Sequence, residues 1–499
     1  MRVPRSALAS IAVLAAALTI AAADGAYAQR VFTRNSPNAV AWPRGPVRGT
    51  NGIRGGARRS GVPARNYVNG SFSPNVPGIE PGTVQIIDGG NIDDDGDGPR
   101  RPSRRGRNSS GTPSGSAPQV PKEVVVEIAN SATPQQIDAL QRRHRLTRLE
   151  SQRFELAGTT MVRWRIPDRR SVATVARALE ADRIVASAQP NYLFALQEDE
   201  AKPASEGDPA QYELAKLHLP QAHMLAKGDN VLVAVIDSGI DAAHPELSGA
   251  IAQSYDTLSV PMAPHAHGTA IAGLIAAHGK LMGAAPAARI LAIRAFSGTG
   301  GSAEGTTFNI LKGLDWAAAN GARVINMSFA GPDDPALHRS LAAAHKKGIV
   351  LVAAAGNAGA KSPPLYPAAD PNVIAVSATD ADDKLFQQSN RGHHIAVAAP
   401  GAEILVAIPD KQYTVSSGTS YSAAEVSGII ALMLERRHDL TPDKVRDILL
   451  ATARDLGPKG RDVMFGAGLA DAYRALKAED VPIAVSAPAH SERASTGAR

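Results

Sequence analysis

The sequence predicts an α/β fold in which a mostly parallel sheet lies between two layers of helices, preceded by a smaller α+β unit. From about residue 212 to 477, short continuous apolar runs alternate with helical stretches, the pattern of a parallel sheet covered on both faces. Residues 121–199 instead follow a β-α-β-β-α-β order, which is typical of a ferredoxin-like sandwich. A chain of 499 residues has room for both units.

In the unit 121–199, capping signals and periodicity locate both helices and three of the four strands. Thr133 and Gln136 form a capping box for a helix that begins at Pro134. A second amphipathic helix is expected over 171–179. Strands are expected at 124–128, at 160–166 and within 184–196.

In the α/β unit, the expected strands are continuous apolar runs with helices between several of them. The active site of such a fold lies at the carboxyl ends of the strands. The strands are expected at 231–236, 290–295, 324–327, 349–355, 373–376 and 395–398. The helices are expected at 269–277, 304–320 and 335–347, with another from about residue 420 to 437.

Outside the two folded units, the composition predicts an export signal and two disordered segments. In residues 1–28, two arginines precede an apolar run that ends in the small-x-small cleavage site Ala26-Tyr27-Ala28. A retained membrane anchor is the alternative, but these flanks favour cleavage and a secreted protein, periplasmic or extracellular, without stable membrane insertion. Residues 29–120, rich in glycine, proline and arginine, and the tail 479–499 are expected to be disordered.

The composition also excludes several classes of function. Because the chain has no cysteine, it cannot be a disulfide scaffold, ligate a metal through thiolates or use a thiol nucleophile. The net charge is +6, but residues 29–118 alone hold thirteen arginines and six acids, so the folded part is nearly neutral and no nucleic-acid partner is expected. Residues 91–97 resemble the start of an EF-hand loop, yet Pro102 stands where the bidentate glutamate belongs, so no calcium is expected there.

Three motifs lie where the expected sheet would place an active site. Asp237 directly follows a strand, His267 opens an alanine-rich helix, and Ser420 precedes a long helix. Taken singly, such an aspartate or serine is more often a turn or helix cap, and such a histidine is usually structural. A helix that begins at Ser420 could equally stabilise an oxyanion through its N–H group and dipole.

Taken together, the motifs resemble the subtilisin-like serine peptidases, or subtilases. The order Asp, His, Ser with small residues around each is the order in that family. The resemblance covers about residues 209–478 and implies the family's three-layer fold and an endopeptidase that acts through an acyl-enzyme. The matching segments are Val-Ile-Asp-Ser-Gly-Ile at 235–240, His-Gly-Thr at 267–269, Asn-Met-Ser-Phe-Ala-Gly at 326–331, Ala-Ala-Ala-Gly-Asn at 353–357 and Gly-Thr-Ser at 418–420.

The resemblance assigns a role to each reacting group. Ser420 would be the nucleophile, His267 its general base and later the acid for the leaving amine, and Asp237 the group that orients the imidazole. Asn357 would donate its side-chain amide to the oxyanion beside the Ser420 N–H. Activity should fall as the imidazole protonates, around pH 6.5 for an ordinary histidine.

The resemblance also implies the substrate-binding residues. The segment Ser328, Phe329, Ala330, Gly331 would pair with an extended peptide, as in β-augmentation. Leu365, before the family's Tyr-Pro turn, stands near the floor of the primary specificity pocket where the family often has a small residue, so we expect a shallow pocket for small or medium apolar side chains. Ala354 and Gly356 would line the same groove.

The unit 121–199 resembles the family's propeptide, an inhibitor and folding chaperone that places its C-terminal strand in the active site until it is cut. The resemblance therefore implies an autoprocessed zymogen, with the cut between about Leu196 and Asp208. Besides peptide or protein substrates, the expected partner is therefore this propeptide in cis, and the enzyme is expected to be a monomer. The loop at 278–282 is shorter than the one that binds calcium in many relatives, so no cofactor and at most weak calcium binding is expected. Two other readings stay open: a pseudoenzyme that serves as a binding module, and a protein that its arginine-rich segment tethers to an acidic envelope.

Overall fold

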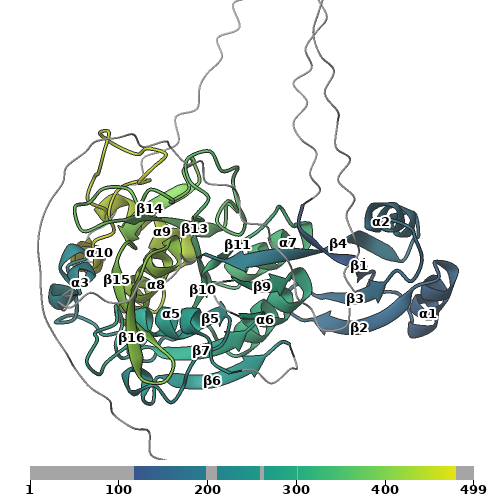
Figure 1. Ribbon diagram of the computed structural model, residues 1–499, viewed down its shortest axis with the longest axis horizontal. Coiled ribbons are helices and arrows are strands. Elements are labelled where there is room, and N and C mark those ends of the chain that lie inside the picture. The colour runs from purple at the N-terminus through teal and green to yellow at the C-terminus, as the bar shows by residue number, and fades with distance from the viewer. Residues whose placement is uncertain (1–116, 198–210, 259–262, 300–301, 479–499) are drawn as a thin grey trace, which may run out of the picture. The chain divides into compact units, whose positions relative to one another are not determined.

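The computed structural model describes residues 117–197, 211–258, 263–299 and 302–478 (Figure 1). The expected signal peptide, nearly all of the expected disordered segment, the loop at 91–97 and the C-terminal tail lie outside these ranges. The first strand begins at Gln119, so the last two residues of the stretch 29–120 belong to a strand instead. Within the described ranges, no helix has the length and apolar character needed to cross a membrane.

Residues 117–197 form the ferredoxin-like unit that the sequence predicts; we call them the N-terminal unit. Its strands pair antiparallel in the order β2-β3-β1-β4, with the helices between them in the chain. Both halves of the capping box at Thr133 are present, and Ser171 caps the second helix. The elements are β1 (Gln119–Ile128), α1 (Pro134–Arg143), β2 (Thr147–Phe154), β3 (Thr159–Arg165), α2 (Val172–Glu180) and β4 (Val185–Leu196).

The second unit, residues 211–478, is built on a seven-stranded sheet in the order β14-β13-β12-β10-β5-β7-β6, and every neighbouring pair is parallel. This confirms the α/β prediction. The strands are β5 (Leu232–Asp237), β6 (Ile251–Asp256), β7 (Arg289–Arg294), β10 (Val324–Met327), β12 (Val350–Ala354), β13 (Val373–Thr379) and β14 (Ile395–Pro400).

Alternate residues of β5 show how the helices cover both faces of this sheet. Val233 and Val235 lie in one core cluster with residues of α5 (Ala266–Ala276) and α8 (Thr419–Arg436). Ala234 and Ile236 lie in a second cluster with residues of α6 (Thr307–Ala319) and α7 (Pro335–Lys346). A strand buried on both faces has no need of polar alternation, which explains the continuous apolar runs in the sequence.

One predicted helix is wrong at its start. The helix expected from residue 304 begins at Thr307, because Ser302–Thr306 form strand β9, paired antiparallel with β8 (Phe296–Thr299). Other elements are not predicted from the sequence. They are β2, β6, the strand β15 (Ile404–Ile408), which pairs with β16 (Gln412–Ser416), and the helices α3 (Tyr212–Lys216), α4 (Leu219–Ala222), α9 (Pro442–Thr452) and α10 (Ala472–Ala478).

The strand order places three neighbouring strand ends at one point. After β5 the chain forms β6 at the edge of the sheet and then β7 between β6 and β5, and it later resumes on the other side of β5 with β10 and β12. Ligands bind at such a switch point, outside the carboxyl ends of the strands. Asp237 ends β5, Ser328 follows β10, and Asn357 follows β12.

Candidate active site

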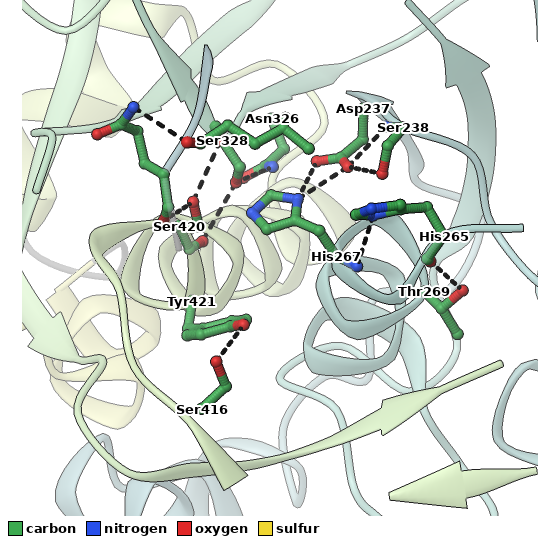
Figure 2. Close-up of polar contacts among 12 residues, drawn as sticks. Asp237, Ser238, His265, His267, Thr269, Asn326, Ser328, Ser416, Ser420 and Tyr421 are labelled. Carbon is green, nitrogen blue, oxygen red and sulfur yellow. Dashed lines mark hydrogen bonds and ion pairs between the residues drawn. The ribbon is translucent and has the colours of Figure 1, made fainter. Parts of the chain in front are cut away.

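Asp237 and His267 form a fully buried pair at this switch point (Figure 2). His267 lies in the first turn of α5, and its Nδ1 is 2.8 and 2.9 Å from the two carboxylate oxygens of Asp237. The backbone N–H and the hydroxyl of Ser238 donate to the same carboxylate, at 2.7 and 3.0 Å. A carboxylate held in this way fixes the orientation of the imidazole and stabilises its protonated form.

Ser420 lies in the first turn of α8, and in Figure 2 the imidazole of His267 lies between it and Asp237. The Ser420 hydroxyl donates to the backbone oxygen of Gln197, at 2.5 Å, and to that of Ser328, at 3.2 Å. The nucleophile candidate therefore touches the last described residue of the N-terminal unit. The N-terminus of α8 brings backbone N–H groups and the positive end of the helix dipole to the same place.

The side chain of Asn357 is oriented through its oxygen, which leaves its Nδ2 group able to donate to another molecule or group. Its side-chain oxygen accepts from the backbone N–H and the hydroxyl of Thr419, at 3.1 and 2.8 Å. Its Nδ2 is buried and has no hydrogen-bond partner within the described part of the chain. Gly356 before it has a φ of +106°, and a Cβ there would lie 2.4 Å from Asn390 Nδ2, so the turn requires glycine.

The end of β4 runs between two strands of the second unit. Leu193, Phe194 and Ala195 pair antiparallel with β9. On the other side, Ala195 and Leu196 pair antiparallel with β11 (Phe329–Ala330). The segment thus occupies the groove beside Ser420 as an added strand, the geometry of β-augmentation.

Two side chains of this segment contact the groove. The Phe194 ring packs edge-on against Phe329 at a centroid distance of 6.0 Å, and a Cβ at Gly331 would lie 2.2 Å from it. The Gln197 carboxamide accepts from the backbone N–H of Asn357, at 2.9 Å, and donates back to two carbonyl groups of its own strand. Leu365 lies beside this position, 3.1 Å from where a Cβ on Gly356 would be.

The structure thus brings most of the expected site residues to one groove. Ser420 contacts the carbonyl of Gln197, the Asn357 backbone contacts the Gln197 side chain, and Asp237 holds His267 beside Ser420. Within the 328–331 segment, Phe329 and Ala330 pair with β4, and Gly331 bridges to Tyr366. The peptide bond Tyr366–Pro367 is cis. Ala354 differs from the rest, because its side chain belongs to the main core cluster.

Two features of the site were not predicted from the sequence. One is strand β9, which forms the second wall of the groove, and the other is the pair of hydrogen bonds from Thr419 that orients the Asn357 side chain. The Gly-Thr-Gly-Gly sequence at 298–301 is a turn signal that could have revealed the hairpin. In the described part of the chain, no group of three or more His, Asp or Glu side chains is placed to bind a metal ion.

A family model described as the subtilase family matches residues 228–468. Thermitase from Thermoactinomyces vulgaris is 34% identical over 275 residues, which cover 54% of this chain and 96% of thermitase. Subtilisin DY from Bacillus licheniformis is 37% identical over 46% of this chain and 86% of its own length. The chain therefore belongs to the subtilase family of serine peptidases, which act on peptides and proteins.

Two further comparisons extend over only part of the matched protein. The minor extracellular protease Epr of Bacillus subtilis (strain 168) is 36% identical over 267 residues, which cover 52% of this chain but 40% of Epr. The crystal structure of fervidolysin from Fervidobacterium pennivorans, a keratinolytic enzyme related to subtilisin, matches with a TM-score of 0.62 and 24% identity, over 72% of this chain and 61% of fervidolysin. The second likeness supports the fold alone.

Proposed function

We propose that this chain is an exported serine endopeptidase, made as a precursor that cuts its own backbone directly after Gln197. One observation carries the proposal: the Ser420 hydroxyl lies 2.5 Å from the carbonyl oxygen of Gln197, at the end of a strand held in the groove. Export is inferred from the expected signal peptide, and the name of the relative Epr, an extracellular protease, agrees with it.

In the proposed chemistry, the Ser420 oxygen bonds to the Gln197 carbonyl carbon while His267 accepts the hydroxyl proton. The carbonyl oxygen becomes an oxyanion, and the Asn357 Nδ2 and the Ser420 N–H donate to it. The C–N bond after Gln197 then breaks as His267 delivers the proton to the leaving amine. Water, activated by His267, hydrolyses the resulting acyl-enzyme and restores Ser420.

After this cut, the N-terminal unit would remain as an inhibitor, because the contacts that hold it do not involve the broken bond. Phe154 of β2 packs edge-on against Phe308 of α6 at 5.6 Å. Polar contacts reach the same face of the second unit: Gln189 Nε2 donates to Asp334, and Arg339 bonds Glu127. The unit would thus leave the active site only when these contacts are broken.

The groove suggests which peptides the mature enzyme cuts. We propose that it binds extended chains with a large apolar residue four positions before the cut, where Phe194 packs on Phe329, and a small or medium residue directly before it. Gln197 is of medium size, although it is polar. Frequent cleavage after bulky aromatic residues in a peptide library would contradict the shallow pocket.

We further propose that the short loop after α5 needs no calcium. The buried carboxylate of Glu246 accepts from the backbone N–H groups of Gly279, Lys280 and Leu281, at 2.9 to 3.0 Å, and from the Tyr413 hydroxyl at 2.7 Å. Burial opposes the ionisation of Glu246, but the hydrogen bonds from these donors outweigh it and lower the pKa of Glu246. Protein groups therefore stabilise the negative charge, and no bound cation is needed for this. A chelator should therefore leave the melting temperature of the purified enzyme unchanged, and a clear drop would contradict this proposal.

A serine-directed fluorophosphonate probe tests the proposed function directly. It should label Ser420 in the mature enzyme and fail to label the Ser420→Ala variant. A folded wild-type protein that is never labelled would instead support a pseudoenzyme that serves as a binding module.

A further inference from the structure

His338 lies on α7, outside the reacting groups, and bonds two carboxylates at once. Its Nδ1 is 2.6 Å from Asp370 Oδ2, and its Nε2 is 2.7 Å from Asp333 Oδ1. A neutral imidazole has one N–H and can donate to only one of them, whereas the protonated ring donates to both. The arrangement therefore favours the imidazolium form.

The two carboxylates belong to two different loops, and both loops continue into the substrate groove. Asp333 lies between Gly331 and the start of α7, while Asp370 follows the Tyr366–Pro367 turn. The loops also touch directly, since the Gly331 N–H donates to the Tyr366 oxygen at 2.8 Å and the Tyr366 N–H donates back at 3.0 Å. The imidazole of His338 packs edge-on against the Tyr366 ring at 4.8 Å.

These loops carry two walls of the groove. Gly331 lies directly against Phe194, and Leu365, the residue before Tyr366, lies beside Gly356 at the pocket for the residue that precedes the cut. A change in the spacing of the loops would therefore alter the groove both where it contacts Phe194 and where it receives the residue before the cut. Asp237, His267 and Ser420 lie on other elements and would keep their positions.

We infer that His338 is a positioning residue for substrate binding. As a cation it hydrogen-bonds Asp333 and Asp370 at the same time, and it thereby holds together the two loops that form the groove walls. This rests on the proposed function, because the groove is the one that β4 fills. The consequence is that extended substrates bind more weakly once His338 loses its proton.

The surroundings of His338 decide the direction of this pH dependence. Burial by itself would lower the pKa of His338, but the hydrogen bonds and charges of Asp370 and Asp333 outweigh it and raise the pKa. The titratable groups facing the ring are these two carboxylates and the Tyr366 phenol, whose pKa is raised by burial and by both carboxylates. Arg446 of α9 interacts electrostatically with Asp370 and donates to the Pro371 oxygen at 2.9 Å. The protonated ring, which bonds both carboxylates, therefore persists to a higher pH than in an ordinary histidine and is lost as the pH rises through the raised pKa of His338.

Steady-state kinetics on the mature enzyme test this inference, with Phe-Ala-Leu-Gln p-nitroanilide as substrate between pH 6 and pH 10. In the wild type, KM should rise at alkaline pH while kcat stays level. In His338→Gln, KM should be raised about two- to fivefold in the lower part of this pH range, as expected for a partly exposed charge pair, and should no longer change with alkaline pH. A shorter substrate that lacks the phenylalanine should show a smaller change.

His345→Gln is the matched control, since His345 lies on the same helix and its Nε2 is 3.2 Å from Asp443, away from the groove. It should keep the wild-type KM profile. If His338→Gln is too unstable to assay, Asp333→Asn removes the more exposed partner and should give the same flattened profile. A wild-type KM profile in the assayed variant, or a change confined to kcat, would overturn the inference. Fluorophosphonate labelling of Ser420 separates the two proposals, because it should stay normal in His338→Gln and fails if the proposed chemistry is absent.

Discussion

The two halves of β4 have different surroundings. From Val185 to Pro190 the strand pairs with β1, and Ala188 packs into the core of the N-terminal unit. From Leu193 to Leu196 it pairs with β9 and β11, and Phe194 and Leu196 lie in a core cluster of the second unit. The first half is thus held by its own unit, whereas the second half takes its conformation from the enzyme that it enters.

This difference shows how one strand can be both a structural element and a bound peptide. The second half is held by main-chain pairing on both sides and by a few side-chain contacts, which any extended peptide of similar sequence could reproduce. The first half, with the body of the N-terminal unit behind it, adds contacts that a free substrate lacks. Substitutions in the reacting groups, in the second half of β4 and in the contacts of the body of the N-terminal unit should therefore affect cutting, docking of the strand and release of the unit to different extents.

The largest effect is expected for Ser420→Ala, which removes the proposed nucleophile but leaves both halves of β4 in place. Self-cutting should fall by at least about 10⁴-fold, so that the precursor accumulates at full length. Gel electrophoresis of freshly expressed protein measures this. A precursor cut at the same rate in the variant would mean that another protease makes the cut.

Asn357→Ala should come next, because it removes the proposed side-chain donor to the oxyanion and changes no residue of β4. Turnover should fall about 100- to 1,000-fold, the loss seen for the matching asparagine of subtilisin, with little change in KM. Thr419→Val, which removes the hydroxyl that holds the Asn357 side chain, should give a smaller loss in kcat. A raised KM with unchanged kcat would contradict the assigned role.

Phe194→Ala tests the second half alone. Removing a buried phenylalanine costs about 3 kcal/mol, so docking of the strand, and with it the rate of the first cut, should fall about 100-fold. Stopped time courses of precursor processing measure the rate. Arg153→Ala, on an exposed part of β2, is the control and should process at the wild-type rate.

The smallest effect is expected at a contact between the body of the N-terminal unit and the second unit, the ion pair of Lys312 with Glu150 of β2, whose nitrogen and oxygen are 2.9 Å apart. Lys312→Gln should weaken the hold of the cut N-terminal unit by at most about 1 kcal/mol, or about fivefold, and less at high salt. The recovery of activity after dilution of the cut complex measures this. An effect as large as that of Phe194→Ala would show that the two halves do not differ as argued.

The same contrast explains what the sequence could and could not predict. The N-terminal unit and the central strands follow from periodicity and capping, as at Thr133, because local sequence decides them. That Asp237, His267 and Ser420 lie close together could be predicted because each stands within a short motif. The resemblance also implies that the last strand of the unit 121–199 lies in the active site, but the exact position of Gln197 at Ser420 does not follow from the sequence. It depends on pairing with β9, a short strand whose Ala303 and Glu304 favour a helix and which only its partners hold extended. Likewise, no sequence signal shows that Thr419 donates to the side-chain oxygen of Asn357 and so sets the orientation of its amide.

The central claim is that Ser420 attacks the carbonyl of Gln197 in its own chain. Mass spectrometry of the N-terminal fragment, taken at the earliest time after wild-type synthesis, measures the C-terminal residue of that fragment. The account predicts a fragment that ends at Gln197 and is missing in Ser420→Ala. A first fragment that ends at any other residue would contradict it.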